Sequence, residues 1–107
     1  MLSIIIPVKN EYENLEAIDS QFRNNFENIN YEVLLINDFS EDDTIQKAEK
    51  ICFNNKKIAI YNNKKKGLGG AISLGIKKAK GDFVCIMMAD FSDSIIEIGR
   101  ASCRERV

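Results

Sequence analysis

The chain has 107 residues, enough for one domain with a modest hydrophobic core. Its 15 basic and 16 acidic residues nearly cancel, so no bulk positive field would attract nucleic acid or anionic lipid, and we expect no nucleic-acid partner. No apolar run approaches the roughly 20 residues of a membrane-spanning helix, and an odd count of three cysteines favours buried free thiols in a cytoplasmic protein over a disulfide framework.

The chain opens with a short β-branched run followed by a helical stripe. A strand is predicted over residues 2–8, with the only proline, Pro7, at its end. A helix is predicted over about residues 11–25 with Asn10 as its cap. Its apolar residues recur at helical spacing and should pack on the sheet: Leu15, Ile18, Phe22 and Phe26.

The next two runs repeat this alternation. A strand is predicted over Tyr31–Asn37, and a helix from about Asp42 to Cys52 with Ser40 as its candidate cap. The acidic residues near its start favour the helix dipole. The residues expected to face inward are Ile45, Ala48 and Ile51.

The remaining elements complete an α/β pattern. A third strand is predicted over Lys57–Tyr61, a helix over about residues 68–79, and a fourth strand over Phe83–Met88. The order βαβαβαβ predicts a mainly parallel, Rossmann-like sheet.

Polar clusters follow three of these strands. They are Lys9-Asn10-Glu11, Asn37-Asp38 and Ala89-Asp90-Phe91-Ser92-Asp93. The carboxyl ends of parallel strands meet at one edge of a sheet, and open α/β sheets bind their ligands there. Since carboxylate oxygens suit hard divalent ions, the pattern predicts a nucleotide and a metal at this edge.

Two common phosphate-binding loops are excluded by the residues after the first strand. The segment Pro7-Val8-Lys9-Asn10-Glu11 contains neither the Gly-x-Gly-x-x-Gly turn nor the Gly-Lys-Ser/Thr loop. Glycines 67, 69 and 70 follow the third strand instead, where a tight turn or close packing explains them as well as a ligand does.

Four segments carry a resemblance to a known family. They are Ser3–Glu11, Glu32 with Asn37–Thr44, Lys66–Ala71 with Gly75, and Gly81-Asp82 with Ala89-Asp90. In this order they resemble the family 2 glycosyltransferases, and the ending Met-Ala-Asp-Phe-Ser-Asp is most similar to the polyprenol-phosphate sugar transferases of that family. The resemblance spans about residues 2–95 and implies the nucleotide-binding half of a GT-A fold.

The resemblance also implies a reaction and a set of site residues. The reaction is inverting transfer of a sugar from a UDP- or GDP-linked donor to an acceptor, expected to be a polyprenyl phosphate at the cytoplasmic face of the membrane. Asp90 is implied as the catalytic residue, and Asp90 with Ser92, and Asp93 as a further candidate, as ligands of Mg²⁺ or Mn²⁺. Met88 stands where relatives carry the first acid of Asp-x-Asp, and a thioether is a poor ligand for these ions. The implied nucleotide-binding residues are Pro7, Lys9, Asn10, Glu11, Asp38, Lys66 and Ala89.

Plainer interpretations stay open for single residues. Asn10-Glu11 suits a helix start, Asp38 an ordinary loop acid, and Ser40 with Asp43 a variant capping box. For the whole protein, the alternative to an enzyme is a non-catalytic nucleotide-sugar-binding or regulatory protein. A phosphoacceptor receiver domain is disfavoured, because the paired acids it needs after the first strand are missing.

The last eleven residues, 97–107, do not continue the apolar pattern. They resemble one translated frame of a sequencing adapter, so residues 1–96 are interpreted as the N-terminal part of a glycosyltransferase domain and 97–107 as a non-native tail. A short basic tail is the alternative. Because the acceptor site and further catalytic groups would lie in the missing half, we expect the 107-residue chain to be inactive.

Overall fold

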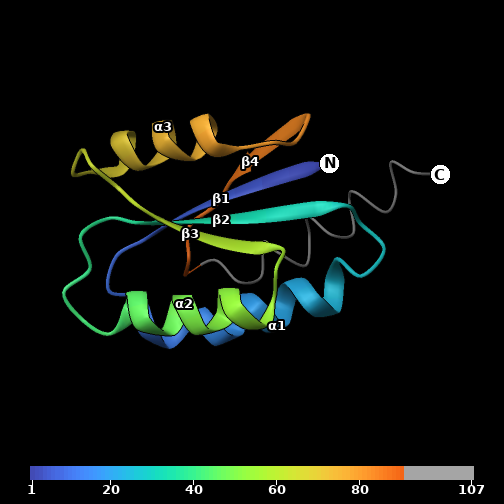
Figure 1. Ribbon diagram of the computed structural model, residues 1–107, viewed down its shortest axis with the longest axis horizontal. Helices are drawn as coiled ribbons and strands as arrows, with labels where there is room; N and C mark the ends of the chain where they lie inside the picture. The colour runs from blue at the N-terminus through green and yellow to red at the C-terminus, as the bar shows by residue number, and fades with distance from the viewer. Residues whose placement is uncertain (91–107) are drawn as a thin grey trace.

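The computed structural model describes residues 1–90, which form a four-stranded parallel sheet with helices on both faces (Figure 1). The sheet order is β3-β2-β1-β4. Its strands are β1 (Leu2–Val8), β2 (Tyr31–Asn37), β3 (Ile58–Asn62) and β4 (Phe83–Ile86). The helices α1 (Leu15–Asn25) and α2 (Thr44–Asn54) cover one face, and α3 (Leu68–Lys78) covers the other. The predicted α/β architecture is confirmed, and all three strand pairings are parallel.

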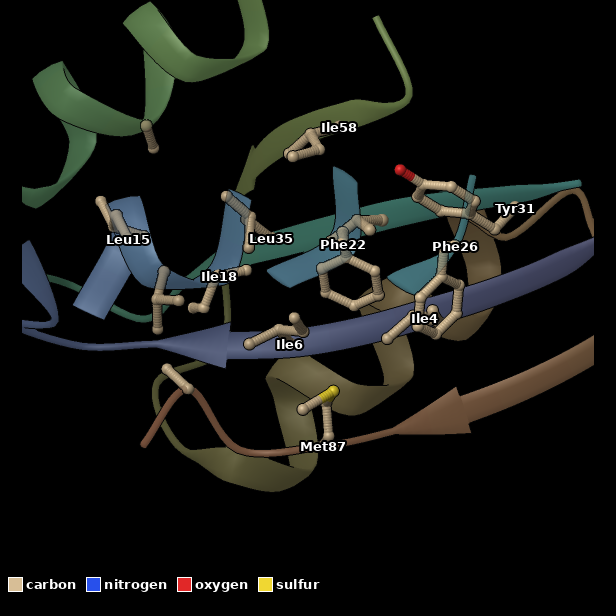
Figure 2. Packing of buried hydrophobic residues seen from close by; sticks show 14 of the residues in the cluster. Ile4, Ile6, Leu15, Ile18, Phe22, Phe26, Tyr31, Leu35, Ile58 and Met87 are labelled. Atoms are coloured by element: carbon tan, nitrogen blue, oxygen red, sulfur yellow. The ribbon is translucent and has the colours of Figure 1, made fainter. Parts of the chain in front are cut away.

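The larger of two apolar clusters lies between the sheet and the pair α1 and α2. The predicted stripe of α1 and the residue after it is fully buried, as expected: Leu15, Ile18, Phe22 and Phe26. The rings of Phe22, Phe26 and Tyr31 pack together with centroids 4.8 to 5.6 Å apart (Figure 2). Aromatic residues bury large apolar areas, so this group contributes strongly to the core. The cluster on the α3 side is smaller and consists of Ile5, Leu34, Ile36 and Ala71.

Both of the first two helices begin later than predicted. A 3₁₀ turn, η1 (Tyr12–Asn14), precedes α1, and Asn10 caps neither element. Helix α2 begins at Thr44, and the predicted cap Ser40 is instead an acceptor for the backbone N–H of Asn10 at 3.1 Å. These two cap predictions are wrong because both side chains form hydrogen bonds between the loops after β1 and β2. Residue preferences at helix ends do not predict such long-range partners.

The proposed capping box of Ser40 and Asp43 is absent from α2, whose first residue is held differently. A carboxylate oxygen of Asp42 accepts the backbone N–H of Thr44 at 2.9 Å. On the inner face of the helix, Ala48 is fully buried and Ile51 packs at the margin of the core, whereas Ile45 is only half-buried. The predicted inward-facing side of α2 is therefore confirmed for Ala48 and Ile51, while Ile45 lies outside the core cluster.

Strand β4 ends at Ile86, two residues before the predicted end. The N–H of Met87 still donates to the carbonyl of Ile5 at 3.0 Å. The next bond of this parallel ladder would need the N–H of Pro7, which proline lacks. Pro7 remains inside β1, in register with Ile36 of β2, so the proline ends the neighbouring strand rather than its own. The chain is thereby released from the sheet just before Asp90.

Glycines set the close approach of α3 to the sheet. A Cβ at Gly75 would overlap the side chain of buried Ile5, and one at Gly70 would overlap the carbonyl oxygen of Lys65. Gly67, directly before α3, has a φ of 115°, which side-chain-bearing residues rarely adopt. The turn-and-packing interpretation therefore holds for Gly67 and Gly70 but not for Gly69, where a Cβ would meet no other atom and φ is not positive.

Two thiols lie within the described residues. Cys52 and Cys85 are free and half-buried rather than buried as predicted. Burial raises the pKa of Cys52 to about 11 and also raises the pKa of Cys85, so both thiols stay protonated and weakly nucleophilic near neutral pH. Separately, residues 1–90 contain no helix that combines the length and apolar character needed to cross a membrane.

Candidate functional site

Three loops meet at the carboxyl edge of the sheet. Two of them carry the predicted clusters Lys9-Asn10-Glu11 and Asn37-Asp38, whereas the third loop was not among the predicted clusters. The three loops follow β1, β2 and β3, and backbone hydrogen bonds extend the ladders into them. The N–H of Asp38 donates to the carbonyl of Val8, and the N–H of Asn63 donates to the carbonyl of Asn37, both at 2.8 Å. The edge is thus a connected platform rather than three separate loops.

Asp38 is the anionic centre of this platform. One carboxylate oxygen accepts hydrogen bonds from the Asn63 amide and from the backbone N–H of Gly67, each at 3.0 Å. The Gly67 bond, followed by the Asn63 bond and the charges of Lys9 and Lys66, holds the pKa of Asp38 below its ordinary value despite partial burial. Asp38 is therefore ionised at neutral pH. Within residues 1–90 its second oxygen accepts no hydrogen bond, so that oxygen is available to a ligand donor.

Asn63 holds the third loop in place, a role that the sequence analysis missed. Its side chain is buried, and its amide donates to the carbonyls of Lys65 at 2.6 Å and Gly67 at 3.3 Å as well as to Asp38. Its amide oxygen accepts the N–H of Lys65 at 3.3 Å. The available signal was the pair Asn62-Asn63 at the end of β3 and directly after it, since asparagine side chains often bond to nearby backbone.

Asn10 connects the first and second loops. It adopts a φ of 53°, and its amide oxygen accepts the backbone N–H groups of Glu41 at 2.8 Å and Asp42 at 3.4 Å. Glu11 is half-buried and accepts the Asn14 amide at 2.6 Å. Both predicted nucleotide-binding residues thus also organise the loop in which they lie.

The remaining predicted site residues differ in solvent exposure. Lys9 and Lys66 are exposed near Asp38, while Pro7 and Ala89 are buried and offer little surface to a ligand. Asp90 is exposed and follows Ala89, which packs in the larger core cluster. The structure therefore gathers Lys9, Asn10, Asp38 and Lys66, and places Asp90 after the neighbouring strand.

The fit of a divalent ion rests on Asp90. Residues 1–90 contain no group of three or more His, Cys, Asp or Glu side chains that could by themselves hold a metal. One exposed carboxylate is still compatible with Mg²⁺, which keeps several waters and takes other ligands from substrate phosphates. Met88 is 38% exposed and adds no oxygen. The other metal candidates, Ser92 and Asp93, lie outside the described residues, as does the predicted tail.

An open hollow of about 500 Å³ lies beside Asn10. Four carboxylates line it, from Glu11, Glu13, Asp42 and Asp43. This concentration of negative charge disfavours a diphosphate, so phosphate groups are expected on the side of Lys9 and Lys66.

Sequence comparison identifies relatives of this chain. The family model described as Glycosyl transferase family 2 matches residues 3–98. The chain is 39% identical over 89 residues to a dolichol-phosphate mannosyltransferase of Pyrococcus furiosus, covering 83% of this chain and 25% of that protein. It is 37% identical over 95 residues to the putative glycosyltransferase CsbB of Bacillus subtilis, covering 84% and 28%. The chain thus spans about a quarter of the length of these curated relatives.

Solved structures share the fold. A TarS structure of S. aureus has a TM-score of 0.72 at 25% identity, covering 83% of this chain and 16% of that chain. A TarS 1–349 structure in complex with UDP has a TM-score of 0.66 at 26% identity, covering 83% and 27%. The mannosyltransferase PcManGT of Pyrobaculum calidifontis, solved with GDP-Man and Mn²⁺, has a TM-score of 0.66 at 21% identity, covering 83% and 27%, which shows likeness of fold alone.

Proposed function

Because this chain belongs to glycosyl transferase family 2, we propose that its carboxyl sheet edge binds a nucleotide-diphosphate sugar, UDP- or GDP-linked, and that the complete protein transfers the sugar with inversion. In such a transfer the acceptor attacks the anomeric carbon from the face opposite the departing diphosphate, so positioning and electrostatics supply most of the rate. The described residues would hold the donor.

The single observation that carries this proposal is the arrangement around Asp38. Its carboxylate is fixed by Asn63 and Gly67 through one oxygen, and the other oxygen, which has no hydrogen-bond donor among residues 1–90, would accept the N–H groups of a nucleobase. Lys9 and Lys66 lie close enough to lower the pKa of Asp38 by their charge. One edge therefore offers an acceptor for the base and cations for the phosphates.

Asp90 would hold the divalent ion, Mg²⁺ or Mn²⁺, together with the diphosphate and with Ser92 outside the described residues. When bound, the ion neutralises charge on the leaving diphosphate. Asp90 would act as the catalytic residue through this contact, since it lies four residues beyond the end of β4, the strand that borders β1.

The acceptor is proposed to be a polyprenyl phosphate at the cytoplasmic face of the membrane. The support is the 39% identity to a dolichol-phosphate mannosyltransferase. A phosphate acceptor is already ionised near neutral pH and needs little help from a base.

Residues 1–96 are proposed to be the N-terminal part of a longer glycosyltransferase domain, followed by a non-native tail. The support is the coverage of a quarter of each curated relative, together with the exposed apolar edge strand β4. Its Phe83 is 73% exposed, and Val84 and Ile86 are each 44% exposed. On this proposal, the 107-residue chain binds donor without turning it over.

The second candidate function is a non-catalytic nucleotide-sugar-binding or regulatory protein. The observation that favours it is Met88, which supplies no oxygen where metal-dependent relatives carry an acid. A protein of this kind would bind the donor without dependence on Mn²⁺.

The test is calorimetric titration of this chain with UDP-glucose and with GDP-mannose, with and without Mn²⁺. We expect Asp38→Asn to weaken binding by at least about tenfold, because it replaces a charged acceptor with a neutral one. Asp82→Asn, the same exchange at the opposite end of the sheet, serves as the control. Asp90→Ala should remove the dependence on Mn²⁺.

The outcomes separate the candidates. No binding of either donor would refute the proposed site. Donor binding that changes neither on addition of Mn²⁺ nor in the variant Asp90→Ala would favour the non-catalytic binding or regulatory function. Turnover of a donor by the gene product extended beyond residue 96, in the presence of polyprenyl phosphate, would establish the enzyme.

A further inference from the structure

The charges of this chain are unevenly distributed. Residues 50–81 contain nine lysines and no acidic residue, and six of those lysines lie in residues 64–80, which include α3. Helices α1 and α2 together carry three acidic and three basic side chains, so they have no net charge. Since α3 covers the opposite face from α1 and α2 (Figure 1), the near-neutral total hides one positive face.

The lysines of the α3 face form no ion pair within the described part of the chain, although the charge of Lys66 acts on nearby Asp38. The ion pairs found in residues 1–90 use the Met1 amine, Arg23 and Lys47, and none uses a lysine of residues 64–80. Lys64, Lys65 and Lys77 are exposed around a groove of about 530 Å³. Small or apolar residues also line this groove: Gly69, Gly70, Ser73 and Leu74.

Apolar side chains are exposed among these lysines. On α3, Leu68 is 50% exposed and Ile76 is 52% exposed, with half-buried Ile72 between them at helical spacing. A helix that combines exposed aliphatic residues with flanking lysines is suited to lie in the interface of an anionic membrane. Nucleic acid fits less well, because residues 64–80 contain neither arginine nor an aromatic residue for base contacts.

We propose that the α3 face, defined as α3 with the loop 63–67 and Lys80, docks on the surface of a membrane containing anionic phospholipid. The lysines contact the headgroups, and Leu68 and Ile76 enter the boundary between headgroups and acyl chains. This contact requires no nucleotide sugar, so it stands or falls independently of the proposed transfer reaction.

The test is sedimentation of the protein with vesicles of phosphatidylglycerol and phosphatidylcholine in equal amounts, and with vesicles of pure phosphatidylcholine. We expect binding to the anionic vesicles only, weakening as salt is raised. The double variant Lys64→Gln/Lys77→Gln should lose about 25-fold in affinity, at about fivefold per lysine. The control Lys50→Gln/Lys56→Gln removes the same charge outside the α3 face and should lose much less.

A charge-conserving variant and a second ligand sharpen the result. Lys64→Arg/Lys77→Arg should bind like the unmodified protein, which separates loss of charge from loss of fold. Equal losses in both glutamine variants, or no preference for anionic vesicles, would overturn the proposal. Binding of a mixed-sequence DNA duplex without binding of vesicles would also overturn it and assign the face to nucleic acid.

Discussion

Replacing Asn63 with alanine is expected to destabilise the fold and to loosen the candidate site together. The side chain is buried, and it makes one hydrogen bond to the Asp38 carboxylate and three to the backbone of the loop before α3. Alanine removes all of them and leaves the Lys65 carbonyl and N–H without this partner.

The magnitude follows from the kinds of bond that are lost. A hydrogen bond to a charged group contributes about 1.5 to 3 kcal/mol, and a neutral one about 1 kcal/mol. Asp38 is half-exposed, so water can replace part of the lost interaction. The bond to the Gly67 carbonyl at 3.3 Å shares the Asn63 amide nitrogen with two shorter bonds, and the bond from the Lys65 N–H is also long at 3.3 Å, so both add little. We therefore expect the free energy of unfolding to fall by about 2 to 3 kcal/mol, a large share of the 5 to 15 kcal/mol typical of a domain.

The assay is urea unfolding at pH 7 followed by circular dichroism, with Asn62→Ala as the matched control. Asn62 is exposed, and its side chain accepts one hydrogen bond, from the Asn37 amide at 3.1 Å. That variant should lose about 1 kcal/mol or less, with the urea dependence unchanged in both variants. Equal losses for the two variants would show that Asn63 does not hold the loop as its contacts indicate.

Three further predictions concern the same platform and its supports. Gly75→Ala forces a Cβ against buried Ile5 and should lower the free energy of unfolding by about 1 to 3 kcal/mol, whereas the exposed exchange Ser73→Ala should not lower it. Phe39 has a φ of 59°, a conformation that strains the backbone of a residue with a side chain. Phe39→Gly should relieve this strain and raise the free energy of unfolding by up to about 1 kcal/mol, after subtraction of the greater freedom of glycine in the unfolded chain. Thermal unfolding that shows no gain in stability would mean that the strain is absent. Because the pKa of Asp38 is lowered in the folded state, the ionised carboxylate stabilises the fold at pH values above its ordinary pKa, and this stabilisation is lost as the pH falls through the lowered pKa. Asp38→Asn should therefore flatten the pH dependence of the free energy of unfolding below about pH 5. An unchanged pH dependence would contradict the lowered pKa.

The architecture was predictable because it depends on local periodicity. The apolar run of residues 2–8 and the stripe from Leu15 to Phe26 each show which side is buried, and strand direction then places Lys9, Asp38 and Asp90 after neighbouring strands of one sheet. The strands β1 and β2 have the predicted bounds. Elsewhere β3 and α2 are shifted by one or two residues, α1 begins later than predicted and β4 ends earlier, because end effects compete with the apolar pattern.

Phe39 shows how a departure from the family pattern acquires a physical meaning. The resemblance to family 2 glycosyltransferases implies that relatives often carry glycine at this position, and the structure gives the position a positive φ, the conformation that glycine favours. The residue type alone showed only that this chain differs from the pattern. The backbone angle explains why glycine is common there.

The sequence by itself determined the order of the elements, the parallel sheet and the edge on which the polar residues gather, because these follow from short-range apolar spacing and from chain direction. Only the tertiary structure decided that Ser40 accepts the N–H of Asn10, thirty residues away, that Asn63 holds Asp38, and that Pro7 ends the strand beside its own. Each of these outcomes depends on which residue from a distant part of the sequence lies nearby in the folded chain. A hydrogen-bonding side chain has several possible partners, and folding brings only one set of them within reach.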